Sequence, residues 1–474
     1  MTKILLFGID GAAPELIFDK WLDYLPNIKR LIQKGSYAKL NSTIPPSTII
    51  AWNAMISGKD PSEIGVFSYT FKDAEGNSRL VTSKNRKCRL IWDVLREQGK
   101  KAVSLYVPLS FPVNSINDGN SVNNGTTFPG SIVSGFLTPS VESDCTYPLS
   151  LKKKIKQLGN PDIFFDVASG LASHKELDIS KLVENAYKMT EMQITLLKDL
   201  LVNEEWDVFM SVMLGSDRLQ HMLWRHFDET HRRHIKESPH KNVLRDYYIY
   251  LDKQLGEIIE LLERDTEDFV IIVASDHGMV KQEGKININN WLIKEGYLVL
   301  KEDVDLTSRK RFKNEYVDLE KSVAWGGGAY NARIFINRIK GSDDYHKIRE
   351  EIKYKLLQIP DDNGNKIDTK VYFADEIYVD SSSSECPDLT VYFDDLRWAS
   401  NPDLGQEGLY SWHSAVGADS AGHSRQGCFI ISGRGIPNKS LMEDLDIKQV
   451  APTILKLLNI PIPQDIKVSP IDLE

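Results

Sequence analysis

Four short apolar runs constrain the fold of this chain more than any other feature. Each is apolar on both faces and ends in polar residues or glycine, which is typical of central strands in a parallel sheet covered by helices. The four runs are KILLFGI at Lys3–Ile9, DVFMSVML at Asp207–Leu214, DFVIIVA at Asp268–Ala274 and GCFIIS at Gly427–Ser432. Helical spacing of apolar residues marks the segments 182–201, 247–262 and 446–457. Alternation of this kind predicts an α/β fold.

The composition is that of a folded protein with a large core. The chain has 474 residues, of which 41% are hydrophobic and 26% charged, and its length suits at most about three domains. The net charge of −9 argues against binding of a nucleic-acid polymer, because such a protein needs an excess of Lys and Arg. It does not exclude a small anionic substrate that is held by metal ions.

Cysteine usage and the first residues predict a cytoplasmic location. Cys88, Cys145, Cys386 and Cys428 are scattered without a CxxC pair, which indicates reduced thiols. The opening MTKILLFGIDGA has a short apolar run that ends at Asp10, so it predicts a buried strand rather than a signal peptide. No apolar segment approaches the ~20 residues of a membrane span, so no membrane partner is expected.

Two regions depart from the alternating pattern. Residues 115–150 are rich in Asn, Ser, Gly and Pro, and they predict a long irregular insertion. Residues 300–400 carry charge runs and alternating strand-like pieces such as ARIFIN and LTVYF. We therefore expect a catalytic core over residues 1–300 and 400–474, and a smaller α+β cap insertion over 300–400.

Chemically reactive side chains follow three of the predicted strands. Asp10 follows the first, and Asp217 and His221 follow the second with the spacing of one helical face. Asp276 and His277 follow the third. Ligands of open α/β sheets bind beyond the carboxyl ends of the strands. We therefore expect these side chains to converge.

This set of Asp and His residues indicates a site for divalent metal ions of the zinc class. The number of ligands fits two ions, and a pair of ions is a known device for phosphoryl transfer. Each residue also has an ordinary structural explanation, since Asp or Thr at such places often caps a helix. Their joint occurrence at strand ends favours the metal site.

Five segments resemble the alkaline phosphatase superfamily, in its type I phosphodiesterase/nucleotide pyrophosphatase family. They are GIDGA, PPSTIIAWNAMISGKDP, SDRLQHMLW, SDHGM and GHSRQGCFIISGRGI, and they occur in the order of the family from residue 1 to about residue 436. The resemblance implies an α/β/α sandwich with a mostly parallel central sheet and a smaller α+β cap.

The resemblance also implies a complete catalytic site. One metal ion would be held by Asp217, His221 and His423, and the other by Asp10, Asp276, His277 and the oxygen of Thr48. Thr48 would be the nucleophile and would form a phosphothreonine intermediate. Zinc is the expected metal, with manganese and other divalent ions as alternatives.

The expected function is metal-dependent hydrolysis of phosphodiester or pyrophosphate bonds in a small organic phosphate or nucleotide. Asn53 and His413 are candidate substrate contacts. The alternatives are a phosphomonoesterase or phosphomutase of the same superfamily, and a catalytically silent metal-binding homologue. The natural substrate and the oligomeric state stay open at this point.

Overall fold

The structure is a computed structural model, and it describes residues 2–73, 77–113, 128–168, 178–266, 268–337, 342–412, 419–439 and 444–473. The chain forms two compact units. The first comprises Met1–Leu223, Glu237–Met279 and Arg425–Glu474, and the second comprises Trp224–Lys236 and Val280–Ser424. The core and cap boundaries expected from the sequence stay a prediction, and each unit is described by itself.

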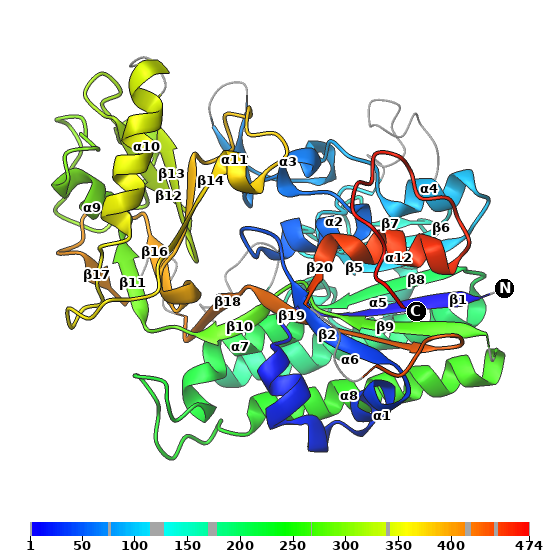
Figure 1. Cartoon of the computed structure of the whole chain (residues 1–474). Helices are drawn as coiled ribbons and strands as arrows, with labels where there is room; N and C mark the ends of the chain where they lie inside the picture. Colours follow the sequence, from blue (N-terminus) through cyan, green and yellow to red (C-terminus); the bar gives the residue numbers. More distant parts are fainter. Residues whose placement is uncertain are drawn as a thin grey trace. The chain divides into compact units, whose positions relative to one another are not determined.

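The first unit is built on a nine-stranded sheet with the order β20-β2-β19-β9-β1-β8-β5-β6-β7 (Figure 1). Its strands are β1 (Lys3–Ile9), β2 (Ser36–Asn41), β5 (Ala102–Val107), β6 (Gly130–Ser134), β7 (Thr146–Tyr147), β8 (Val208–Met213), β9 (Phe269–Ala274), β19 (Gln426–Gly433) and β20 (Leu445–Asp446). The mixed α/β fold with a mostly parallel central sheet is confirmed. All four predicted strands lie in this sheet.

The centre of the sheet is parallel. β1 pairs in parallel with both β8 and β9, and β5 continues the parallel arrangement between β8 and β6. Two features differ from the sequence expectation. The fourth apolar run, β19, runs antiparallel to β9. The sequence did not indicate this, because an apolar pattern does not encode strand direction. Gly130–Ser134 forms a strand within the stretch predicted to be irregular, and the sequence did not indicate it because small polar residues interrupt its apolar pattern.

Helices cover both faces of this sheet (Figure 1). On one face, α2 (Thr48–Ser57), α4 (Ile91–Glu97) and α12 (Val450–Leu457) contribute to an apolar cluster with the strands. On the other face lie α1 (Pro26–Lys34), α6 (Ile179–Asn203) and α8 (Val243–Asp265). The helices expected over 182–201 and 247–262 are therefore present, each slightly longer than the apolar pattern indicates.

A glycine in β1 allows α2 to approach the sheet closely. Trp52 of α2 is fully buried, and a Cβ atom added to Gly8 would lie 2.5 Å from its ring and 2.9 Å from the carbonyl oxygen of Ser211. Only a residue without a side chain fits between these atoms. Gly8 therefore fixes the depth at which α2 packs.

We expect Gly8→Ala to destabilise the protein by about 1–3 kcal/mol, because the added methyl group must displace Trp52 or the backbone of β8. Urea unfolding measures this loss. Gly327→Ala is the matched control, since the nearest atom to its added Cβ is 3.6 Å away and a change within about 0.5 kcal/mol is expected. Equal stability of Gly8→Ala and the parent would contradict the packing role.

Among its described residues, the second unit contains a four-stranded and a three-stranded sheet. A four-stranded antiparallel sheet has the order β12-β13-β15-β14, and a three-stranded sheet has the order β16-β11-β17. The strands are β11 (Gly284–Asn287), β12 (Ala324–Gly327), β13 (Ala332–Ile336), β14 (Lys370–Phe373), β15 (Leu389–Tyr392), β16 (Trp398–Asn401) and β17 (Tyr410–Ser411). The helices α9 (Ile288–Lys294) and α10 (Ser342–Leu356) belong to the same unit, which has an apolar core of its own.

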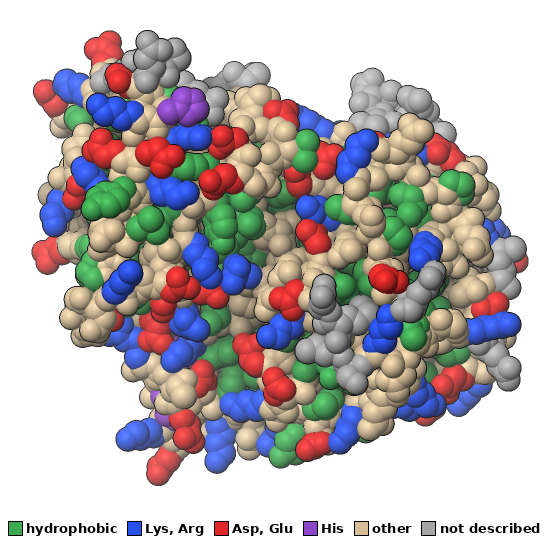
Figure 2. All heavy atoms as spheres, in the orientation of Figure 1, with side chains coloured by type: hydrophobic (Ala, Val, Ile, Leu, Met, Phe, Trp, Pro, Cys, Tyr) green, Lys and Arg blue, Asp and Glu red, His purple; other side chains and the backbone are tan. Residues whose placement is uncertain are grey.

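Figure 2 shows Lys and Arg side chains interspersed with Asp and Glu over the face in view. Within the described part of the chain, no helix is both long and apolar enough to cross a membrane.

Candidate active site

The predicted site residues lie where the central parallel strands end. Asp10 directly follows β1, and Asp276 lies two residues after the end of β9. Asp217 lies in the first turn of α7 (Gly215–Phe227), which begins two residues after β8. Because β1 pairs with both β8 and β9, the three carboxylates lie in segments that follow adjacent strands. They are all buried.

The Nε2 atom of His277 is the centre of this arrangement. It lies 3.1 Å from Oδ2 of Asp276, 3.8 Å from Oδ1 of Asp10 and 3.2 Å from Oγ1 of Thr48. Residues from the ends of two strands and the start of one helix thus meet at one atom. The sequence expectation that these groups converge agrees with this geometry.

The hydrogen bonds around His277 leave acceptors facing one another. Its Nδ1 lies 3.0 Å from the carbonyl oxygen of Gly278, and because a carbonyl only accepts, Nδ1 carries the proton and Nε2 presents a lone pair. Among the described residues, Oδ1 of Asp10 and Oδ2 of Asp276 have no hydrogen-bond partner. A lone pair surrounded by carboxylate oxygens is a suitable ligand set for a cation.

Burial and mutual repulsion disturb the charges of these carboxylates. Burial raises the pKa of Asp10 well above its usual range, and the negative charge of Asp217 raises it further. The pKa of Asp276 is raised in the same way, by burial first and then by Asp10. A hydrogen bond of 2.8 Å from Nε1 of Trp52 to Oδ2 of Asp10 acts in the opposite direction. A bound cation would offset the same repulsion.

Asp217 and His221 lie one helical turn apart on α7. Oδ1 of Asp217 is 3.3 Å from Nε2 of His221. Asp217 also belongs to a buried group with Asp10 and His277, whose ligand atoms all lie within 4.8 Å of one another. The structure therefore places Asp217 within reach of both predicted ligand sets.

Thr48 is the first residue of α2, and its side chain does not cap the helix. Ser47 occupies the N-cap position and makes no side-chain capping hydrogen bond. The Thr48 hydroxyl instead contacts His277. The interpretation of Thr48 as a helix cap is therefore wrong in this structure. The Thr48 hydroxyl faces the buried carboxylates, and it lies at the amino end of a helix, a position that favours anions.

Hydrogen bonds from α7 and from the segment after β1 hold the strand ends together. The Ser216 hydroxyl donates to the carbonyl oxygen of Asp10 at 2.7 Å, and Nε2 of Gln220 donates to that of Gly11 at 2.9 Å. The backbone amide of Gly11 donates to Oδ1 of Asp276 at 3.2 Å. The positions of the carboxylates are thus fixed from two neighbouring strands at once.

Three predicted residues remain, namely His423, Asn53 and His413. His423 lies on β18 (Ala421–Ser424) in the second unit, where its ring stacks on that of Tyr330 with centroids 4.4 Å apart. Nδ2 of Asn53 donates to the carbonyl oxygens of Ile49 and Pro108 at 2.8 and 3.0 Å, so both amide hydrogens are used within the protein. His413 lies outside the described residues. The roles of all three stay predictions.

Three further side chains belong to the site and were not expected. Trp52 holds Asp10, and Arg218 pairs with Asp217 at 3.1 Å. The Tyr69 hydroxyl lies at Thr48, and burial raises its pKa to about 12 although hydrogen bonds with Thr48 and Ser47 lower it. Trp52 and Arg218 both lie in segments that resemble the family. For Trp52 the only signal in the sequence is its helical spacing from Thr48, and for Arg218 it is the adjacency to Asp217.

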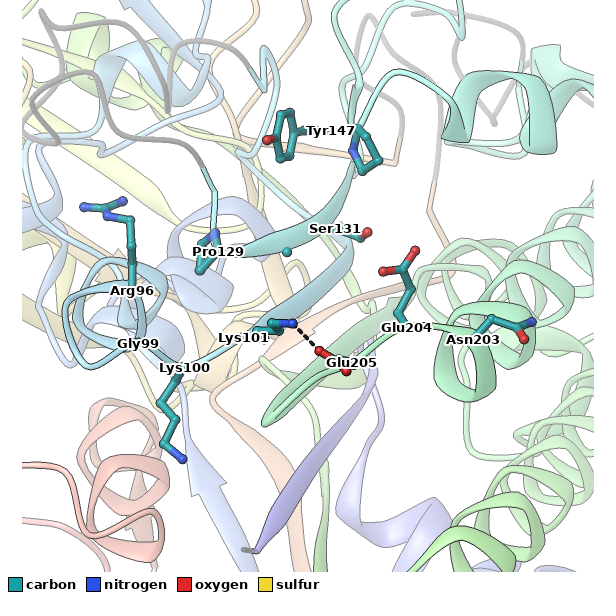
Figure 3. A pocket seen from close by; sticks show the side chains of 12 residues that line it. Arg96, Gly99, Lys100, Lys101, Pro129, Ser131, Tyr147, Asn203, Glu204 and Glu205 are labelled. Atoms are coloured by element: carbon teal, nitrogen blue, oxygen red, sulfur yellow. Dashed lines mark hydrogen bonds and ion pairs between the residues drawn. The ribbon is translucent and has the colours of Figure 1, made fainter.

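A surface pocket of about 640 Å³ lies at the amino ends of the parallel strands, the opposite end from the candidate site. It is next to the amino ends of β5 and β6, with Lys101 paired to Glu205 across it (Figure 3). Its charged residues also include Arg96, Lys100 and Glu204. Because the candidate site lies at the carboxyl ends of the parallel strands, this pocket is separate from it.

Comparisons with known proteins agree with this geometry. A model of the type I phosphodiesterase/nucleotide pyrophosphatase family matches residues 4–419. Two similar solved structures are murine ectonucleotide pyrophosphatase/phosphodiesterase 5, inactive through a Thr-to-Ala replacement and in complex with AMP, and the human protein of the same name. The murine chain is 12% identical, with a TM-score of 0.56 and coverage of 98% of this chain and 96% of that chain. The human chain is 14% identical, with a TM-score of 0.54 and coverage of 98% of this chain and 96% of that chain.

The fold and site define a hydrolase of the alkaline phosphatase superfamily. The chain belongs to the type I phosphodiesterase/nucleotide pyrophosphatase family, whose members are metal-dependent enzymes that act on small phosphodiester or nucleotide substrates. The structural likeness, at identities this low, shows the fold alone. The comparison with curated proteins found no match.

The raised carboxyl pKa values predict how metal-free protein responds to pH. A group whose pKa is raised in the folded state binds its proton more tightly there than in the unfolded chain. Its stabilising effect is full below the unfolded pKa of about 4 and is lost as the pH rises through the raised pKa. Stability should therefore fall with rising pH.

We expect Asp276→Asn to make this decline shallower, because the neutral amide removes one buried charge. Each unit by which the folded pKa exceeds the unfolded one corresponds to about 1.4 kcal/mol. Urea unfolding between pH 5 and 8 with a chelator present measures the slope. An identical slope in Asp276→Asn and the parent would rule out the assigned charge repulsion.

Proposed function

We propose that this protein is a metal-dependent phosphohydrolase in which Thr48 attacks the phosphorus of a small organic phosphate. The observation that carries the proposal is the 3.2 Å contact between Oγ1 of Thr48 and Nε2 of His277 at the amino end of a helix. The hydroxyl of Thr48 thereby lies next to both the buried carboxylates and a turn of backbone amides. A phosphate group under attack needs this combination.

The residues fit two divalent cations. Asp10, Asp276, His277 and Thr48 would hold one cation, and Asp217, His221 and His423 the other. The acceptor atoms that converge on His277 support the first of these sites. Two of them, Oδ1 of Asp10 and Oδ2 of Asp276, have no hydrogen-bond partner in the described chain. When bound, such ions lower the pKa of a coordinated hydroxyl and neutralise charge on a leaving oxygen. Zinc is the metal that we propose, since Asp and His ligands suit it.

The side chains of the protein would do the rest of the chemistry. The Thr48 oxygen would form a bond to phosphorus and give up its proton to solvent, while the bond to the leaving oxygen breaks and that oxygen takes up a proton, which gives a phosphothreonine. The oxygen of a water molecule would then form a bond to phosphorus and lose a proton, while the bond between phosphorus and the Thr48 oxygen breaks and Thr48 is protonated again. Trp52 keeps Asp10 in place through the hydrogen bond to Oδ2. The backbone amides at the start of α2 would bind the non-bridging oxygens.

The substrate that we propose is a small phosphodiester or nucleotide. The family to which the chain belongs supports it, and the murine neighbour was obtained in complex with AMP. That the inactive murine form carries Ala in place of Thr supports a threonine nucleophile here. His423 as a metal ligand rests on the motif GHSRQG, in which it matches the pattern of the family.

Thr48→Ala tests the nucleophile directly. We expect at least a ~10³-fold loss of turnover on an aryl phosphodiester, as for removal of other catalytic nucleophiles, with the bound metal retained through the Asp and His ligands. Ser57→Ala is the matched control, because it removes a buried hydroxyl at the other end of the same helix, which donates to the carbonyl oxygen of Asn53 and accepts from the amide of Lys59.

Two outcomes would refute this assignment. If Thr48→Ala hydrolysed the diester as fast as the parent, Thr48 would not be the nucleophile. If elemental analysis of the saturated parent gave fewer than two ions per chain, the two-metal arrangement would be wrong. Mass spectrometry can follow the phosphorylated Thr48 trapped in the parent and in Ser57→Ala, and its absence from the Thr48→Ala variant treated in the same way.

Relative rates on different esters distinguish the alternative activities. We expect the parent, with added zinc or manganese, to hydrolyse an aryl phosphodiester faster than the matching monoester or sulfate ester. A faster monoester reaction would favour the phosphomonoesterase alternative. Absence of turnover on all three with full metal occupancy would favour a catalytically silent homologue.

The cytoplasmic location stays a prediction. All four cysteines are described, none of them forms a disulfide bond, and three of them are buried, which supports a reducing environment. Burial raises the pKa of Cys145 to about 11 and that of Cys428 to about 12, so these two thiols are expected to be inert in the folded protein.

A further inference from the structure

A chain of buried charged side chains leads away from the predicted ligand Asp217. Arg218, the next residue of α7, is itself buried. Its Nη1 donates to Oδ2 of Asp217 at 3.1 Å, and its Nε and Nη2 donate to the two oxygens of Asp166 at 2.9 Å each. One planar guanidinium group thus binds two carboxylates, and this Asp166–Arg218–Asp217 arrangement is called the carboxylate chain below.

The outer end of the carboxylate chain is held rigidly. Helix α6 binds the backbone on both sides of Asp166, because Gln193 Nε2 donates to the carbonyl oxygen of Phe164 at 2.8 Å and Asn185 Nδ2 donates to that of Val167 at 2.7 Å. The amide of Val167 also donates to Oδ1 of Asp166 at 2.8 Å. Asp166 is therefore fixed before it meets Arg218.

The guanidinium group is fixed from a further direction. It lies over the ring of Phe136, with its central carbon 4.5 Å from the ring centroid. Phe136 is in turn packed edge-on against Tyr69, with ring centroids 6.0 Å apart. The guanidinium group is thus held by aromatic packing as well as by the two carboxylates.

Stability alone does not account for such a chain. Buried ion pairs commonly contribute little net stability, because the cost of removing charges from water offsets their attraction. The geometry suits a different role. Arg218 engages Oδ2 of Asp217, while Oδ1 lies 3.3 Å from Nε2 of His221, its partner in the predicted ligand set. Outer partners of this kind orient metal ligands in many sites.

We propose that Asp166 and Arg218 are positioning residues that hold the Asp217 carboxylate with one oxygen presented to a divalent cation. This inference rests on the proposed function, since it assumes that Asp217 is a metal ligand. An arginine is required, because a lysine ammonium group is a point charge that cannot bind two carboxylates in this planar fork.

Zinc binding by Asp166→Asn and Arg218→Lys tests the proposal. The full-length parent and the variants are freed of metal with a chelator and titrated with Zn²⁺ in a calorimeter, so the readout does not depend on activity. We expect each variant to bind the zinc ion held by Asp217 ~10–100-fold more weakly than the parent. The double variant should lose no more than the more affected single variant, because the two residues act in series.

Asp252→Asn is the control for a general loss of stability. Asp252 is a buried carboxylate that accepts hydrogen bonds from the amides of Ile28 and Asn27 at 2.8 and 3.1 Å, at the start of α1. This variant should lower the melting temperature and leave zinc affinity unchanged. A parallel loss of zinc affinity in Asp252→Asn would mean that the method reports only stability, and would overturn the proposal.

Zinc affinities within twofold of the parent in folded Asp166→Asn and Arg218→Lys would overturn the positioning role. Fully additive losses in the double variant would overturn the series arrangement. A parent protein that binds no zinc at all would instead contradict the proposed function, and the two failures are thereby distinguished.

Discussion

Buried negative charge at the ends of three adjacent strands is the constraint on which the rest of the first unit depends. Asp10, Asp217 and Asp276 are at most 1% exposed, and carboxylates removed from water need compensation. The protein supplies part of it through the Trp52 ring, the Gly11 amide and the Arg218 guanidinium group. The acceptors that still face His277 form an arrangement that a bound cation would stabilise.

The order of the strands creates this concentration of charge. Because β1 lies between β8 and β9, the segments that follow all three strands meet at one edge of the sheet. Helices α2 and α7 begin at the same edge and bring Thr48 and His221 to it. The close contact between Gly8 and Trp52 fixes how deeply α2 lies against β1. Packing of the core and geometry of the site are thus determined by the same contacts.

Much of the fold and of the candidate site could be predicted from the sequence, because both depend on local patterns. The apolar runs marked the central strands, and the polar residues that end them marked Asp10, Asp217, Asp276 and His277. Strand direction could not be read in this way, and β19 runs antiparallel to β9. Strand β6 was missed because GSIVS lacks a continuous apolar run, although its last four residues are buried.

The sequence by itself determined the family, the α/β class and the candidate chemistry, since motifs and hydrophobic periodicity are properties of neighbouring residues. Only the tertiary structure decided what Thr48 contacts and which groups position the buried carboxylates. Its hydroxyl faces His277, 229 positions away in the chain, and Asp166 reaches Asp217 through Arg218, which lies 52 positions from Asp166. Contacts of this kind depend on packing between distant elements, and no local pattern encodes them.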